Sequence, residues 1–297
     1  FPVWQHDGFA LLDEVWTVSE FCRRSIGEHS PIPVKVIPVP VPDPGVVSRP
    51  RRSSEDPVQF LFCFDFNSTA ARKNPDGVVA AFTAAFPDRA NARLVIKTIN
   101  AESHANTAER LLALTGDDSR IHVVDTYLGV DELDALYAAS DAYVSLHRSE
   151  GFGLTVAEAM IRSLPVIATN YSSTTEFFDG AVGWPIPYEM VPVGSGAAPY
   201  HADAMWAEAD LSAAAAAMRE VADHPDEATR RGAAARDHLL RTRSVDAAAA
   251  WVDTELRAAH RAWLDRPVGP PRGGTLDRAK VALRRARQTV RAARQGL

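Results

Sequence analysis

Six short apolar runs alternate with helix-like stretches between residues 58 and 186, and this alternation limits the possible folds more than any other feature. The runs lie at 58–64, 94–99, 121–124, 142–146, 165–168 and 183–186, and the stretches between them at 76–86, 103–115, 131–139, 154–163 and 173–178. Strands that are apolar throughout are buried on both faces, which is typical of parallel strands joined by helices. The pattern predicts an α/β domain with a doubly wound parallel sheet.

The flanking residues predict a division of the chain into three segments. Residues 1–50 contain one strand-and-helix pattern, between positions 9 and 30, and then a proline-rich extended connector. Residues 51–265 contain the alternation, followed from about position 208 by alanine-rich helices with a break at Pro225. Residues 266–297 form a Pro- and Gly-rich linker and a basic helix. The chain begins with Phe1 rather than Met, so we expect a fragment or processed piece of a longer protein.

The composition of the chain indicates which kind of partner it binds and in which cellular compartment it is found. The net charge of −6 argues against nucleic acid as the main partner. The two cysteines, Cys22 and Cys63, lack metal-ligand spacing and suggest no disulfide framework. No signal peptide is visible, and no apolar run approaches the ~18 residues of a membrane helix. These features predict a cytoplasmic protein.

The basic C-terminal segment has two interpretations. Its helix, over 275–295, is partly amphipathic and carries most of the basic residues of the segment, so it could lie on an anionic membrane surface as a peripheral contact. Its apolar face is mostly alanine and buries little area, which favours a solvated helix or one that docks on another domain.

Polar side chains follow the predicted strands, at the edge of the sheet where ligands of such folds bind. Arg72 and Lys73 follow the first strand, and Glu150 follows the fourth. Asp65 is expected to orient one of the two cations. Lys97, at the second strand, could contact a ligand or only extend to the surface.

The stretch "SLHRSEGFGLTVAEAM", residues 145–160, combines features of an anion site. Gly151 and Gly153 allow the backbone to approach a ligand, and a helix that begins near Leu154 directs free N–H groups at it. Carboxylates repel phosphates, so Glu150 and Glu158 are expected to accept hydrogen bonds from hydroxyls. Phosphates flanked by hydroxyl-bearing sugars meet all these requirements, which predicts a nucleotide diphosphate sugar as ligand.

The segment "EGFGLTVAEAM" resembles the E-x7-E motif of family 4 retaining glycosyltransferases. "FLFCFDFNSTAARKNPDGVVAAF" resembles the diphosphate-binding segment of that family, and the resemblance extends over roughly residues 10–265. It implies the GT-B fold, in which two Rossmann-like domains face a cleft. This chain would supply the C-terminal, donor-binding domain and only the end of the N-terminal domain.

The resemblance also implies roles for individual residues. Glu158 would bind the ribose hydroxyls, Glu150 the hydroxyls of the transferred sugar, and Lys73 with Arg72 the departing diphosphate. The other residues implied at the donor site are Gly151, Phe152, Gly153, Leu154, Thr155, Tyr127 and Leu128. His147 is either a further site residue or a buried histidine at the edge of the core.

The chain departs from the family pattern in two loops. Ser68 stands where an arginine is usual, so Arg72, or hydrogen bonds from Asn67 and Ser68, would replace it. A pair of glycines is common after the fifth strand, where this chain has "YSS" at 171–173.

The resemblance implies transfer of a hexosyl unit to an acceptor hydroxyl with retention. The acceptor would be a saccharide or a lipid-linked molecule. We expect no cofactor beyond the donor and no metal, because the chain has no D-x-D and a helix end with cations can stabilise the leaving group. A glycosidase with paired carboxylates would leave Lys73 and the glycine loop unexplained. The alternative is a non-catalytic nucleotide-sugar-binding module, or a half-enzyme whose partner supplies the acceptor domain.

Overall fold

The computed structural model describes residues 3–45, 56–87 and 91–265, which form two compact units. One unit comprises described residues 3–38 and 246–265, and the other comprises 39–245. The predicted linker and basic helix, over 266–297, lie outside the described residues, and so do residues 46–55, where the first two predicted segments meet.

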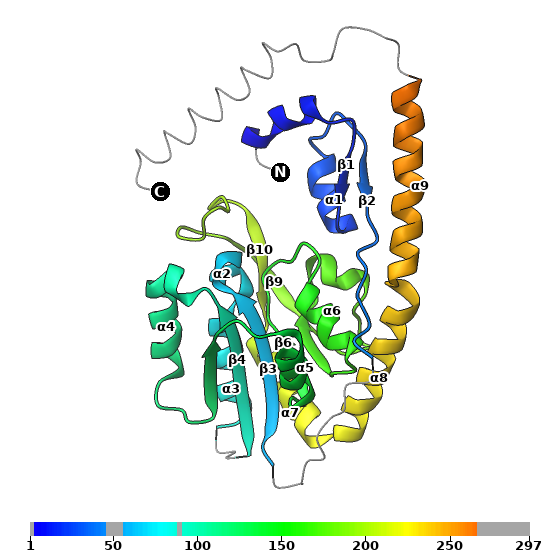
Figure 1. The fold of residues 1–297 in the computed structure, drawn as a ribbon. Coiled ribbons are helices and arrows are strands. Elements are labelled where there is room, and N and C mark those ends of the chain that lie inside the picture. The colour runs from blue at the N-terminus through cyan, green and yellow to red at the C-terminus, as the bar shows by residue number, and fades with distance from the viewer. Residues whose placement is uncertain (1–2, 46–55, 88–90, 266–297) are drawn as a thin grey trace. The chain divides into compact units, whose positions relative to one another are not determined.

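The larger unit is built on a six-stranded sheet in the order β5-β4-β3-β6-β7-β8, in which every neighbouring pair is parallel (Figure 1). The strands are β3 (Val58–Asp65), β4 (Ala92–Ile99), β5 (Ile121–Asp125), β6 (Ala142–Ser145), β7 (Val166–Thr169) and β8 (Trp184–Ile186). Chain order runs outward from β3 in one direction and then outward from β6 in the other. This is the doubly wound order of a Rossmann-like sheet, as predicted.

Helices join the strands and cover both faces of the sheet. They are α2 (Ala70–Lys73), α3 (Pro75–Ala85), α4 (Ala105–Thr115), α5 (Val130–Ala138), α6 (Leu154–Ile161), α7 (Leu211–Asp223) and α8 (Pro225–Thr242), with 3₁₀ turns η2 (Phe66–Ser68), η3 (Ala101–His104) and η4 (Ser172–Glu176). The predicted helix at 173–178 is thus a 3₁₀ turn. The predicted break at Pro225 is confirmed, because this proline begins α8.

Alternation along β3 divides the core in two. Phe60 and Phe62 point into a cluster covered by α3, α4 and α7, whereas Leu61 and Cys63 point into a second cluster covered by α5, α6 and α8. All four side chains are buried. A strand that packs against both layers must be apolar at every position, which explains the continuous runs in the sequence.

An antiparallel hairpin, β9 (Tyr188–Pro192) with β10 (Met205–Ala209), was not predicted. All of β9 is exposed or half-buried, so its sequence lacks the apolar signal of the other strands. The helical region expected from about position 208 therefore begins at Leu211, after this hairpin, and it is broken a second time between α8 and α9 (Val245–Leu264).

The smaller unit contains η1 (Val3–Leu11), β1 (Val15–Thr17), α1 (Glu20–Gly27), β2 (Val34–Val36) and most of α9. The strand and helix expected between positions 9 and 30 are confirmed as β1 and α1, and β2 pairs parallel to β1. Trp16 packs edge-on against Trp251 of α9, with ring centroids 5.0 Å apart. Lys35 on β2 pairs with Glu14 and with Glu255 of α9. These contacts join two segments that are far apart in the sequence.

No helix in the described ranges combines the length and the apolar character that a membrane-spanning segment requires.

Candidate functional site

The carboxyl ends of β3 and β6 mark the point where the chain order of the sheet reverses. In doubly wound sheets the loops from two such strands diverge, and ligands bind in the crevice between them. In this chain those loops are residues 66–74 and 146–153.

The loop after β3 is held against the end of β6 by Asn74. This residue has a left-handed backbone, with φ 60°, and its side-chain oxygen accepts a hydrogen bond from the Gly77 N–H to cap α3. Its Nδ2 donates to the carbonyl of Leu146, 3.0 Å away, at the end of β6. The Arg148 N–H donates to the carbonyl of Arg72. Both bonds lie at the C-terminal end of the short helix α2, which carries Arg72 and Lys73, and they join the two loops there.

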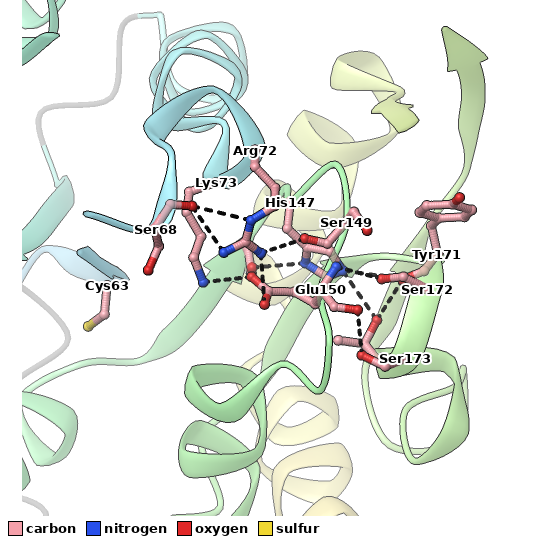
Figure 2. A network of polar contacts seen from close by, with 12 residues as sticks. Cys63, Ser68, Arg72, Lys73, His147, Ser149, Glu150, Tyr171, Ser172 and Ser173 are labelled. Carbon is pink, nitrogen blue, oxygen red and sulfur yellow. Dashed lines mark hydrogen bonds and ion pairs between the residues drawn. The ribbon is translucent and has the colours of Figure 1, made fainter. Parts of the chain in front are cut away.

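Glu150 is paired with both cations of α2 (Figure 2). Its Oε1 lies 2.6 Å from Lys73 Nζ, and its Oε2 lies 3.0 Å from Arg72 Nη1. The guanidinium also donates to the carbonyls of Ser68 and Ser149. All three charged side chains are 10–13% exposed, so the pairs are largely shielded from solvent.

The charge balance at Glu150 fixes its ionisation state. Burial raises the pKa of this carboxyl, but Lys73 and Arg72 lower it by more, and the net pKa lies below its usual value. Glu150 is therefore ionised at neutral pH. A cluster of two cations and one carboxylate retains a net positive charge, which suits an anionic ligand.

The backbone of Glu150 is held from the other side by the loop after β7. Its N–H donates to Ser172 Oγ at 2.9 Å, and its carbonyl accepts from Ser173 Oγ at 2.8 Å. Ser172 has φ 66°, the left-handed conformation that glycine adopts most easily. The serine that replaces a usual glycine therefore keeps a glycine-like backbone and adds a hydrogen bond to the site.

His147 lies behind this cluster and is fully buried. Its Nδ1 lies 3.0 Å from Ser145 Oγ, and its Nε2 is within hydrogen-bond distance of Thr174 Oγ1 and the Tyr171 carbonyl. Burial lowers its pKa, which favours the neutral ring. In this structure His147 fastens the loop after β7 to the end of β6.

Gly153 joins the loop to α6 and has φ 89°. A Cβ at this position would lie 2.4 Å from Thr174 Cγ2, so any side chain would force the two loops apart. The first turn of α6 leaves N–H groups without intrahelical acceptors, next to the cation cluster. Leu154 is half-exposed here, whereas the Phe152 side chain is buried against Phe177.

A cavity of about 290 Å³ extends from Lys73 along the carboxyl ends of the strands. Among the predicted site residues, it is lined by Ser68, Lys73, Tyr127, Leu128, Thr155 and Glu158. We refer to it as the donor cavity, after the ligand that the sequence predicts for this edge of the sheet. Burial raises the pKa of Glu158, and the Tyr137 hydroxyl donates to its Oε2 at 3.4 Å. This glutamate thus has a less polar environment than Glu150.

Two predictions about the first loop are not matched by the geometry. Asn67 does not line the donor cavity but a separate pocket of about 600 Å³ on the other side of α2, where its Oδ1 lies 2.9 Å from His104 Nε2. Asp65 was expected to orient a cation, which is wrong, because it accepts from the Asn67 N–H and from Asn100 Nδ2. A carboxylate at the start of a 3₁₀ turn satisfies the free N–H of that turn, and this local role prevails.

The sequence did not predict Cys63, Leu133 or Tyr137 as residues of the donor cavity, and it left two interpretations open for Lys97. This lysine is 6% exposed and does not extend to the surface. It is the register partner of Cys63, which also lines the cavity and whose pKa burial raises to about 12. The sequence signal for a buried Lys97 was its position in β4, two residues after Val95. Side chains two residues apart in a strand point to the same face, and Val95 packs in the cluster beneath α5 and α6.

Within the described ranges, no three His, Cys, Asp or Glu side chains are grouped so that they could hold a metal ion.

The fold and the cavity at the point of reversal together define a Rossmann-like domain of the kind found in GT-B proteins. A family model described as "Family 4 Glycosyltransferase in conflict systems" matches residues 17–252. The chain belongs to this glycosyltransferase family.

Individual relatives match over smaller parts of their own length. O-antigen biosynthesis glycosyltransferase WclY of Escherichia coli is 30% identical over 115 residues, which are 35% of this chain and 32% of that protein. Sucrose-phosphate synthase from Thermosynechococcus elongatus superposes with a TM-score of 0.65 at 19% identity, over 86% of this chain and 61% of that one. The pneumococcal O-GlcNAc transferase GtfA, in complex with UDP and GlcNAc, superposes with a TM-score of 0.59 at 19% identity. That match covers 87% of this chain and 47% of the GtfA chain. The chain therefore spans a third to three fifths of the length of these proteins.

Proposed function

We propose that this chain binds a nucleotide diphosphate sugar in the donor cavity and forms the donor half of a retaining hexosyltransferase. The observation that carries this proposal is the cluster of Lys73, Arg72 and Glu150, because its Lys73 lines the same cavity as Glu158. Cations, a helix start and a second carboxylate are the groups that a diphosphate between two hydroxyl-bearing sugars requires.

The cations would act on the leaving group. As the bond between the anomeric carbon and the diphosphate breaks, negative charge grows on the diphosphate, and Lys73, Arg72 and the start of α6 would stabilise it. Glu150 neutralises much of this positive charge in the structure. Phosphate oxygens would compete for the two cations and free the Glu150 carboxylate to accept from sugar hydroxyls.

The remaining predicted residues complete the donor site in this proposal. Glu158 would bind the ribose, and Tyr127 and Leu128 would border the base, since all three line the cavity. The backbone of 151–154 and the hydroxyl of Thr155 would contact the sugar or diphosphate. Retention of configuration and the hexosyl unit follow from the family resemblance.

The domain assignment is likewise a proposal. Residues 51–265 would be the donor-binding domain, 1–50 the end of a neighbouring domain with its connector, and 266–297 a linker and basic helix. The acceptor would then bind residues outside this chain. A half-enzyme with a partner subunit is the second candidate.

The test is calorimetric titration of the 297-residue chain with UDP, GDP, ADP and dTDP. We expect one or more to bind, and Glu158→Ala to weaken binding at least about tenfold, because hydroxyls lose a charged acceptor. Lys73→Met should weaken it by a similar factor. Arg230→Met, at an exposed pair on α8, is the matched control and should bind like the unmodified chain.

Absence of binding by a folded chain would contradict the proposal. Binding that both site variants leave unchanged would place the ligand elsewhere. Adding a sugar donor and an acceptor panel then separates the two candidates, because a half-enzyme transfers nothing until its partner is supplied.

A further inference from the structure

Lys97 is a buried cation in the floor of the donor cavity. It lies at the carboxyl end of β4, and its Nζ donates to the carbonyls of Thr98, at 2.7 Å, and Thr126, at 2.5 Å. The bond to Thr126 joins the ends of β4 and β5, and the two bonds together hold the ammonium in place. The side chain is therefore a fixed group rather than a mobile surface lysine.

The ammonium is left with an unused hydrogen-bond donor. A lysine has three N–H donors, and the protein contacts of Lys97 use two of them. Among the described residues Lys97 forms no ion pair within 4.0 Å, although the charge of Asp125 acts on it from further away. Burial lowers its pKa, as expected for a charge shielded from water. A ligand acceptor in the cavity would offset the cost of burying this group.

The order of the strands places Lys97 away from the diphosphate end of the cavity. Lys73 and Glu150 lie where β3 meets β6. Lys97 is on β4, on the other side of β3, and the neighbouring wall, Tyr127 and Leu128, follows β5. A donor whose diphosphate contacts Lys73 would therefore direct its base toward β4 and β5.

The walls around Lys97 suit a flat ring. Leu133 and Tyr137 of α5 and Leu128 line this part of the cavity with apolar and aromatic surface. A base placed there has its sugar-bearing edge toward Glu158 and its opposite edge toward Lys97, at the end of the cavity near β4 and β5. In pyrimidines that opposite edge carries the substituent at position 4, and in purines the substituent at position 6.

We propose that Lys97 selects the base of the donor by donating a hydrogen bond to an oxo group at pyrimidine position 4 or purine position 6. Uracil, thymine and guanine carry this oxo group, whereas cytosine and adenine carry an amino group. An amino group facing the ammonium would leave two donors opposed and both unpaired. The inference rests on the proposed function, since it names the class of nucleotide that the donor cavity accepts.

The test compares matched nucleotides on the 297-residue chain by calorimetry. UDP and CDP differ at position 4, and IDP and ADP carry oxo and amino groups at position 6. For whichever ring size the cavity accepts, the oxo member should bind about 10- to 100-fold tighter, the effect of one hydrogen bond to a charged group. In Lys97→Met this ratio should fall to within about threefold, because the donor is gone.

A second variant guards against a folding defect. Lys97→Gln places an amide at the same position, and its oxygen can accept from an amino group. We expect the ratio of its affinities for oxo and amino nucleotides to fall well below that of the unmodified chain. Circular dichroism, recorded during thermal unfolding, shows whether each variant is folded.

The outcomes separate this inference from the proposed function. If no nucleotide binds the unmodified chain, the proposed function fails and this inference with it. If nucleotides bind with no oxo preference, or the preference persists in both variants, Lys97 does not select the base and the proposed function stands.

Discussion

Glu150 and Glu158 lie on opposite sides of Gly153, eight positions apart, yet the regions around them differ in charge. Two cations surround Glu150 and lower its pKa. Glu158 is half-buried beside Tyr137, and burial raises its pKa. The motif repeats one residue type, and the tertiary structure gives the two copies different properties. One region is suited to the charge of a diphosphate and the other to neutral hydroxyls.

The largest loss of stability is expected from a substitution of Gly153, which lies between the two regions. Gly153→Ala should lower the free energy of unfolding by about 2–4 kcal/mol, because a left-handed backbone is strained for alanine and the new Cβ would clash with Thr174. Urea denaturation measures the change. Gly180→Ala is the control, since its Cβ would meet nothing within 4 Å. Equal losses for the two variants would mean that the loops tolerate the clash.

The opposite pKa shifts predict opposite pH dependences for the two glutamates. The lowered pKa of Glu150 stabilises the fold above the unfolded-state pKa of about 4.5, and this contribution is lost as pH falls through the folded-state pKa. The raised pKa of Glu158 stabilises the fold below about 4.5, and this contribution is lost as pH rises through its folded-state pKa.

Glu150→Gln should therefore be most destabilising near neutral pH and less so in acid. Glu158→Gln should show the reverse trend and become less destabilising as pH rises. Denaturant unfolding of each variant and of the unmodified chain measures both trends when it is repeated from about one pH unit below to about three units above the reference pKa of 4.5. Parallel trends for the two variants would show that the two carboxyls share one environment.

The smallest effect concerns the loop that supports Glu150. Ser172→Ala removes the acceptor of the Glu150 N–H and should cost about 1–2 kcal/mol. Ser172→Gly removes the same acceptor but relieves the left-handed backbone, so it should be more stable than the alanine variant by about 1 kcal/mol. Thermal unfolding of the pair measures this difference. An alanine variant as stable as the glycine variant would show that φ at Ser172 carries no strain.

Much of the fold could be predicted because its signals are local. Phe60, Leu61 and Phe62 are consecutive apolar residues, as expected for a strand that is buried on both faces. The hairpin of β9 and β10 escaped prediction because β9 is mostly exposed, so no apolar pattern marks it.

The candidate site was predictable in composition but not in arrangement. Lys73, Glu150 and Glu158 were expected from the motif, and the structure places Lys73 and Glu158 on one cavity, with Glu150 paired to Lys73. Their roles toward a donor remain predictions. The roles of Asp65 and Asn67 depended on contacts with Asn100 and His104, which come from another loop and have no sequence signal.

The sequence by itself determined the alternation of strands and helices, and with it the class of sheet and the edge at which a ligand is expected. Only the tertiary structure decided that Glu150 pairs with Arg72 and with Lys73, which is 77 positions away in the sequence. It also decided that Lys97 is buried and bonded to the carbonyl of Thr126, which is 29 positions away. Periodic burial is a property of neighbouring residues, so it is visible in the sequence. The charge and hydrogen bonding around a side chain depend on distant segments that meet only after folding.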